Sequence, residues 1–315
     1  MRTERWVRAG VAVALVVGIA ACSSSGSGKR GSKPTTTAAA QPPYKIDQFT
    51  VTYVDHSRPT PRNGSYAGAS TRTLPTVVSI PVGAPRPLPL VVFSTGIDGT
   101  GTNYEGLYGT WVQAGYAVAA PVFPLSNHSA PGGSTIADFS SQPGDVRFVL
   151  TQLLNASAAK SGRLAGEFDP HAIALAGKSL GALTTLRTAY LIADHETRER
   201  AVISLTGGGD ATPEFFKGIT VPLLLEHGDA DKTVPYKASV DAFNAAETPK
   251  FLVTLFGQDH GGAFDGENNA SARVVENTTL DFLDAYVRDG DTGLAKLKHD
   301  GTVAKVASIR SDSGS

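Results

Sequence analysis

Short runs of apolar residues recur along the chain from residue 49 onward, and they alternate with stretches in which apolar positions repeat at helical spacing. Continuous runs of Val, Leu, Ile and Ala are typical of strands that are buried on both faces. The predicted strands are 49–54, 76–80, 90–93, 117–122, 172–176, 201–205, 222–226 and 251–256, and the predicted helices are 103–114, 145–154, 180–192, 236–246 and 272–287.

The order of these elements predicts an α/β domain over residues 44–290. The first two strands follow each other without a helix, which indicates an antiparallel pair leading into a mainly parallel sheet of roughly eight strands with helices on both faces. Segment 103–114 places Tyr104, Leu107, Tyr108 and Trp111 on one helical face, which we interpret as a core face, with a substrate-binding cluster as the alternative. Residues 291–315 are more polar and form either a short appended element or a tail.

The N-terminus has the pattern of an export signal. Arg2, Arg5 and Arg8 precede an uncharged apolar run over 9–21, which is shorter than the roughly 20 residues that span a bilayer. We therefore predict a signal peptide at 1–21. The tetrapeptide Ile-Ala-Ala-Cys at 19–22 resembles a bacterial lipoprotein box. This resemblance implies cleavage before Cys22, lipidation of its thiol, and a protein anchored to the cell membrane on its extracytoplasmic face.

An ordinary cleaved signal or a short buried helix is the alternative interpretation of that run. Segment 22–43 is rich in Ser, Gly, Thr, Ala and Pro, so it buries too little apolar surface to fold and is predicted to be a disordered tether.

Composition narrows the possible classes of function. Cys22 is the only cysteine, so the folded part has no disulfide, thiol nucleophile or cysteine metal site. A net charge of −1 gives no field that attracts nucleic acid. We expect no metal and no cofactor.

The segment Gly-Lys-Ser-Leu-Gly at 177–181 joins a predicted strand to a predicted helix. A nucleophile elbow has this form, because the serine occupies a strained turn and glycines two residues away relieve crowding. The five-residue pattern alone is weak evidence for a nucleophile elbow. Its position between a predicted strand and a predicted helix strengthens the prediction. A nucleotide-binding loop is disfavoured, because Ala172 stands where that motif requires a glycine.

A serine nucleophile requires a histidine base and a carboxylate that orients the histidine. In this type of fold the order along the chain is Ser, acid, His. An acidic loop follows strand 222–226, and Asp231 is chosen as the acid there, with Asp229 as the rival that shapes the turn. His260 follows the next strand and has both the order and the context of the base. Either the order along the chain or the position after the right strand is missing for the other histidines considered, His128, His227 and His299.

An acyl-transfer site also needs N–H donors for the oxyanion. The expected donors are the backbone N–H of Leu180, directly after Ser179, and that of Ile97 in the loop 95–99.

With these motifs the chain resembles the dienelactone-hydrolase-like branch of the α/β hydrolases, close to proteins similar to platelet-activating-factor acetylhydrolase and to the polyester-cleaving cutinases. The residues that carry the resemblance are 89–96, 115–121, 142–145, 177–181, 227–231, 234–235 and His260. The resemblance implies an α/β-hydrolase fold and cofactor-free ester hydrolysis. Thr95 and Lys178 stand where relatives commonly carry histidine, and Lys178 places a cation next to the serine.

The expected function is an exported serine hydrolase that cleaves carboxylic esters with Ser179, His260 and Asp231. Segment 207–220 is too short for a large cap domain, which indicates an open site and favours lipid, acyl or polyester substrates. The alternatives are an amidase or peptidase with the same triad, and a non-catalytic scaffold that binds a lipid or a cell-wall component.

Overall fold

The computed structural model describes residues 43–209, 212–266, 268–290 and 292–314. The predicted signal peptide at 1–21, Cys22 and all of the predicted tether except Pro43 lie outside these residues. Across the described ranges, no helix is both long enough and apolar enough to cross a bilayer.

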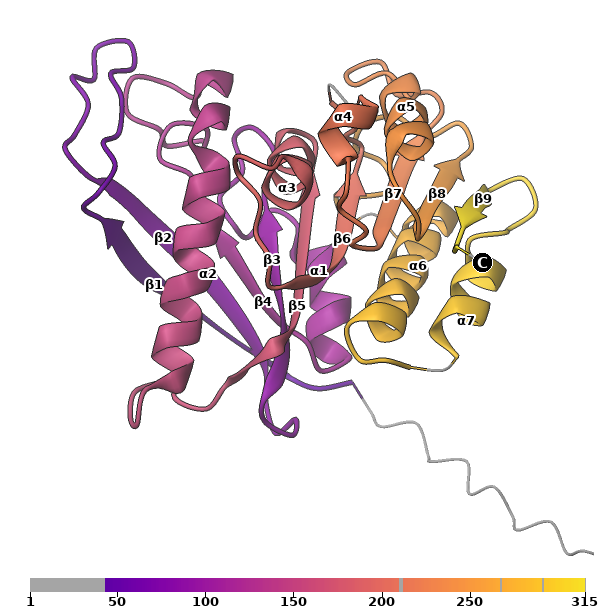
Figure 1. Cartoon of the computed structure of the whole chain (residues 1–315), viewed down its shortest axis with the longest axis horizontal. Coiled ribbons are helices and arrows are strands. Elements are labelled where there is room, and N and C mark those ends of the chain that lie inside the picture. Colours follow the sequence, from indigo (N-terminus) through magenta and orange to yellow (C-terminus); the bar gives the residue numbers. More distant parts are fainter. Residues whose placement is uncertain (1–42, 210–211, 267, 291, 315) are drawn as a thin grey trace, which may run out of the picture. The chain divides into compact units, whose positions relative to one another are not determined.

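A single sheet runs through the domain, with strand order β1-β2-β4-β3-β5-β6-β7-β8-β9 (Figure 1). The six strands from β4 to β8 in this order are parallel to one another, whereas β1, β2 and β9 join antiparallel. The strands are β1 (Ile46–Asp55), β2 (Arg72–Pro81), β3 (Leu88–Ser94), β4 (Ala117–Pro121), β5 (Phe168–Lys178), β6 (Glu199–Leu205), β7 (Leu223–Gly228), β8 (Lys250–Leu255) and β9 (Ala307–Asp312).

The predictions of an α/β domain, a mainly parallel sheet and an antiparallel pair at its start are confirmed. The described sheet has nine strands, one more than the rough expectation of eight. The additional strand is β9, which pairs with β8 and comes from the C-terminal segment that the sequence left as either an appended element or a tail. Its first three residues, Ala307, Ser308 and Ile309, are at least half-buried against the sheet edge.

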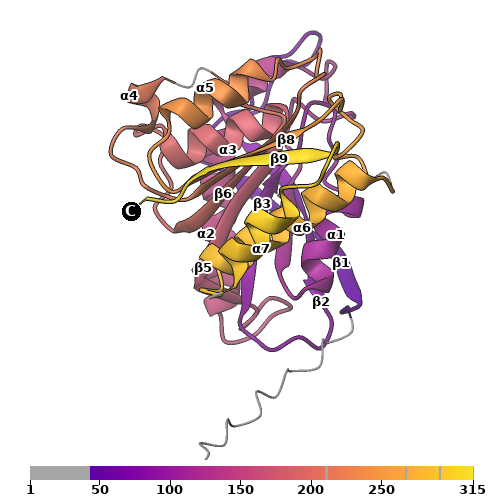
Figure 2. The ribbon, with the colours of Figure 1, turned by 90° about the vertical axis from the view of Figure 1, so that its right-hand side faces the viewer.

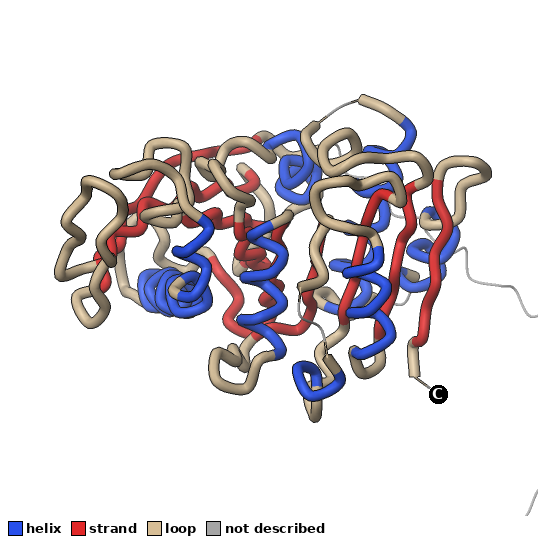
Figure 3. Tube along the Cα trace, turned by 90° about the horizontal axis from the view of Figure 1, so that it is seen from above, coloured by secondary structure: helices blue, strands red, loops and turns tan. Residues whose placement is uncertain are grey.

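Helices cover both faces of the sheet, as Figures 2 and 3 show. Residues of α2, α3, α4 and α5 pack into one core, and residues of α1, α6 and α7 pack into the other. The second core contains Tyr104, Leu107, Tyr108 and Trp111, so their interpretation as a core face is confirmed. The helices are α1 (Glu105–Gln113), the 3-10 helix η1 (Ile136–Ser140), α2 (Gln142–Ala158), α3 (Leu180–Tyr190), α4 (Pro213–Phe216), α5 (Lys237–Ala245), α6 (Ala270–Tyr286) and α7 (Gly293–Asp300).

Helix α2 begins at Gln142, earlier than the predicted start at 145. Pro143 is accommodated because it lies in the first turn, where its missing N–H has no helical partner to lose. Gln142 is buried and bridges two elements near the carboxyl edge of the sheet: its amide donates to Ser126 Oγ at 2.8 Å, and its carbonyl oxygen accepts from the Thr184 hydroxyl of α3.

A buried ion cluster fixes the start of α2 to strand β2. Arg72 is 0% exposed, and its guanidinium donates to Asp145 at 2.7 and 2.5 Å and to Asp138 at 3.0 Å. Arg58 also contacts the Asp145 carboxylate, at 2.8 Å. Removing one partner of such a cluster leaves uncompensated charge in the interior, which costs far more than breaking a surface pair.

We therefore expect Arg72→Met to lower the free energy of unfolding by about 3–5 kcal/mol, because the buried Asp138 carboxylate loses its cation and Asp145 keeps only the partly exposed Arg58. The matched control is Arg163→Met, whose pair with Asp47 is exposed and is expected to contribute about 1 kcal/mol or less. Urea unfolding of both variants measures the difference. Equal losses in the two variants would contradict the assignment.

Glu226 on β7 is a buried carboxyl group without an ionic partner. Its side chain is fully buried, Oε1 lies 2.5 Å from the Thr278 hydroxyl, and Oε2 has no hydrogen-bond partner among the described residues. Burial raises the pKa of Glu226 from 4.5 to about 8. The folded protein therefore holds this proton at neutral pH.

This raised pKa predicts a pH-dependent contribution to stability. Between the ordinary pKa of 4.5 and the folded value of about 8, the unfolded chain loses the proton while the folded chain keeps it, so stability falls as pH rises. Glu226→Gln removes the titration, and we expect the variant to gain about 1 kcal/mol over wild type per pH unit in this window. Urea unfolding at pH 4.5, 6 and 8 tests this, and parallel profiles would contradict it.

Candidate active site

Ser179 lies where β5 turns into α3, at the carboxyl edge of the sheet. Its backbone is left-handed, with φ 58° and ψ −121°, and its N–H donates to Leu205 O at 2.9 Å. The flanking glycines are required by close packing. A Cβ at Gly177 would lie 2.3 Å from Gly181 O, and one at Gly181 would lie 2.0 Å from Ser94 O. The segment therefore has the strained strand-to-helix geometry that exposes a nucleophile.

The structure brings Ser179, His260 and Asp231 together from three loops. His260 Nε2 lies 2.8 Å from Ser179 Oγ, and His260 Nδ1 lies 2.6 Å from Asp231 Oδ2. The carboxylate fixes the proton on Nδ1, so that Nε2 is free to accept the serine proton. The His260 side chain is 19% exposed, so the ring is not sealed from solvent.

Asp231 is saturated with donors. Besides His260, the backbone N–H groups of Thr233 and Val234 donate to Oδ1 at 2.8 and 3.0 Å, and His227 Nε2 lies 3.1 Å from Oδ2. Burial alone raises the pKa of Asp231, but the hydrogen bonds from His260, Val234 and Thr233 outweigh burial and hold the pKa below its ordinary value. The group is therefore a carboxylate at neutral pH.

The rival carboxylate, Asp229, does not contact His260. Its Oδ1 accepts the N–H of Gly257 at 2.6 Å, which ties the turn after β7 to the turn after β8. His299 lies on α7 beside Asp300, and His128 lies in the loop after β4. Of the histidines considered from the sequence, His260 is the one that meets Ser179.

His227 has a role that the sequence did not reveal. Its ring is fully buried, Nε2 faces both Asp231 and the carbonyl oxygen of Val234, and Nδ1 lies 2.7 Å from Ser239 Oγ. Burial lowers the pKa of His227 despite these partners. Two acceptors at Nε2 place the proton of the neutral ring there, so His227 donates to Asp231 and helps to hold it.

The N–H groups of the two expected oxyanion donors, Ile97 and Leu180, make no hydrogen bond to the described residues. In the loop after β3, Asp98 N–H donates to Ser126 O and Gly99 N–H donates to Gly96 O, whereas Ile97 N–H has no acceptor among the described residues. Leu180 N–H, at the first position of α3, also lacks one. The loop packs against the serine, since a Cβ at Gly96 would lie 3.3 Å from Ser179 Cβ.

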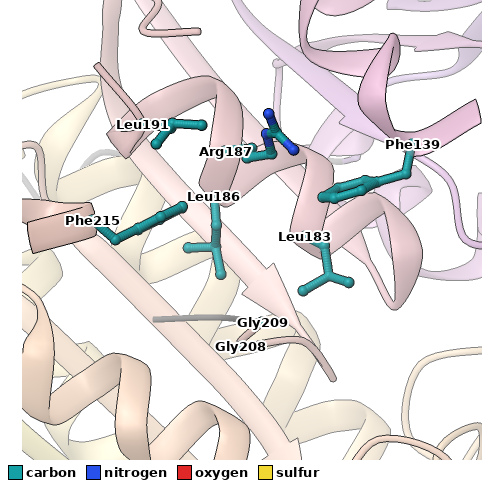
Figure 4. Close-up of a pocket in the computed structure, with 8 residues that line it drawn as sticks. All are labelled: Phe139, Leu183, Leu186, Arg187, Leu191, Gly208, Gly209 and Phe215. Carbon is teal, nitrogen blue, oxygen red and sulfur yellow. The ribbon is translucent and has the colours of Figure 1, made fainter. Parts of the chain in front are cut away.

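An apolar pocket of about 350 Å³ lies along the outer side of α3. None of Ser179, His260 and Asp231 lines this pocket. Its lining residue Leu183 lies one helical turn after Ser179, since the Leu183 N–H donates to Ser179 O at 3.2 Å. Figure 4 shows Phe139 and Phe215 on opposite sides of the α3 leucines, above Gly208 and Gly209. The lining is almost entirely apolar, with Arg187 as its charged member.

The described part of the chain contains no group of three or more His, Cys, Asp or Glu side chains placed to hold a metal ion.

Of segment 207–220, the described residues form one short helix, α4 (Pro213–Phe216).

The geometry predicts that Ser179 reacts with a fluorophosphonate and that the rate depends on Asp231. Asp231→Asn should slow labelling by a factor on the order of 10² to 10⁴, because an amide at this position no longer holds the proton on His260 Nδ1. Asp229→Asn is the matched control, since Asp229 binds the backbone of Gly257 and not the histidine. In-gel fluorescence against time gives both rates. A larger loss for Asp229→Asn would contradict the assignment.

Comparison of the chain with models of known protein families and with curated proteins finds no match.

Proposed function

We propose that the protein is a serine hydrolase of the α/β-hydrolase fold that cleaves carboxylic esters through an acyl-enzyme intermediate. The observation that carries the proposal is the continuous hydrogen-bonded path from Ser179 Oγ through His260 to the Asp231 carboxylate, at 2.8 and 2.6 Å. Its position on the carboxyl edge of a parallel sheet supports it further, because open α/β sheets bind their ligands at this edge.

The steps follow from the geometry. Ser179 Oγ attacks the ester carbonyl while His260 Nε2 takes its proton, and the Asp231 carboxylate stabilises the imidazolium. Leu180 and Ile97 donate their N–H groups to the oxyanion, and each such donor contributes roughly 3 kcal/mol. His260 then protonates the leaving alcohol. Water, deprotonated by His260, releases the acid and restores Ser179.

The substrate we propose carries an apolar acyl or alcohol group. The α3 pocket includes Leu183, one helical turn after Ser179, and its side chains are leucine and phenylalanine apart from Arg187. The short segment between β6 and β7 supports an open site. Lipid acyl esters, bulky acyl esters and polyester chains share this chemistry. No step requires a nucleotide, a metal or another cofactor.

The location we propose is the extracytoplasmic face of the cell membrane, with the domain anchored through lipidated Cys22. The support is the sequence of 1–22, where arginines precede an apolar run that ends in Ile-Ala-Ala-Cys. A doubly or triply acylated cysteine holds a protein on a membrane stably. Ester substrates met outside the cell then reach the site.

Turnover of paired substrates tests the proposal. Wild type should hydrolyse p-nitrophenyl butyrate much faster than butyric p-nitroanilide, and Ser179→Ala should lower kcat for the ester by about a million-fold, because the histidine has no nucleophile to activate. Ser161→Ala, at an exposed serine beyond α2, is the matched control. Preferred anilide cleavage would indicate an amidase or peptidase. A folded wild type that cleaves neither substrate would indicate a binding scaffold.

A further inference from the structure

Lys178, the last residue of β5, is a cation buried directly beside the nucleophile. Its side chain is 7% exposed, which is unusual for lysine because burying an ammonium group costs several kcal/mol unless it is paired. The proposed mechanism gives this charge no task. The residues that contact Lys178 connect it to two loops of the site.

Two groups from different loops meet the ammonium. Lys178 Nζ donates to Asp265 Oδ1 at 3.1 Å and lies 5.5 Å from the ring centroid of Tyr104. Burial, with a smaller contribution from the Asp265 charge, raises the pKa of Tyr104 to about 12. The tyrosine is therefore neutral and presents an aromatic face to the cation.

Asp265 belongs to the loop that carries the catalytic histidine. The N–H groups of Phe264 and Asp265 both donate to Gly261 O, at 2.7 and 3.2 Å, so residues 261–265 form one closed turn directly after His260. The carboxylate lies over this turn, because a Cβ at Gly261 would be 2.9 Å from Asp265 Oδ2. A displacement of Asp265 therefore moves the backbone next to His260.

Tyr104 connects the same cation to the loop of the proposed oxyanion site. Its hydroxyl lies against Gly96, since a Cβ at Gly96 would be 3.1 Å from this hydroxyl and 3.3 Å from Ser179 Cβ. Tyr104 thus packs against Gly96, the residue directly before Ile97.

We propose that Lys178 is a positioning residue: its ammonium group, held between Asp265 and the ring of Tyr104, fixes the His260 loop and the Ile97 loop relative to Ser179. This inference rests on the proposed hydrolase function. Asp265 is 49% exposed, so the ion pair adds little to global stability. Misplacement of catalytic groups by about 1 Å, in contrast, reduces turnover by up to about 100-fold.

The experiment therefore measures global stability and turnover separately. Lys178→Met keeps most of the length of the side chain and suits a buried site, so the free energy of unfolding should stay equal or rise. We expect kcat for p-nitrophenyl butyrate to fall about tenfold, with KM within about twofold, because alignment and not substrate binding is lost. Asp265→Asn should lower kcat similarly. The amount of active enzyme is titrated with fluorophosphonate, so that kcat refers to competent sites.

The double variant Lys178→Met/Asp265→Asn tests whether the two residues act through one contact, and it leaves no unpaired charge that prevents folding. Its kcat should match the lower of the single variants, because both changes remove the same constraint. Lys178→Arg should restore part of kcat. Lys237→Met, which breaks the exposed pair with Asp241 on α5, is the matched control and should behave as wild type.

Unchanged kcat in Lys178→Met and in the double variant would overturn the positioning role while leaving the hydrolase proposal intact. A double variant whose loss equals the product of the two single losses would overturn the shared contact. A wild type that neither labels nor turns over would overturn the hydrolase proposal itself, and the positioning role with it.

Discussion

The constraint on which the site depends is the turn of β5 into α3 at a single residue. Ser179 adopts φ 58°, a conformation that costs about 1–3 kcal/mol for a residue with a side chain. The surrounding packing holds it there, because helix α3 lies so close to β3 and β5 that Gly177 and Gly181 have no room for a Cβ. Since β5, β7 and β8 are parallel, the loops after β7 and β8 reach the same edge as the serine.

Neighbouring carboxyl groups in this protein differ in charge because their donors differ. Asp231 receives hydrogen bonds from two backbone N–H groups and lies against two imidazoles, which keep it ionised. Glu226, on the strand that leads to Asp231, meets one hydroxyl and holds its proton. Asp231 is therefore charged where it contacts His260, whereas Glu226 on the strand that leads to it is neutral.

Several polar residues near the site act through the backbone elements that carry it. Gln142 joins the loop after β4 to α3, and Arg72 joins β2 to the start of α2 through Asp145. His227 contacts Asp231 Oδ2, the same oxygen that His260 contacts. Each is buried and hydrogen-bonded, so each restricts the elements around the serine to one arrangement.

The sequence by itself determined the α/β class, the mainly parallel sheet, most helices and the candidate residues Ser179, Asp231 and His260. These features depend on local signals, namely apolar periodicity, glycine spacing and the order of loops after strands. It left the short elements η1, α4, α7 and β9 undefined, because their stability comes from packing and not from their own pattern. Only the tertiary structure decided between Asp231 and Asp229, gave His227 its role, and joined Lys178 to Asp265 and Tyr104. Those relations depend on side-chain positions in loops far apart in the chain, and distances of a few ångströms between such loops are set by the packing of the whole sheet.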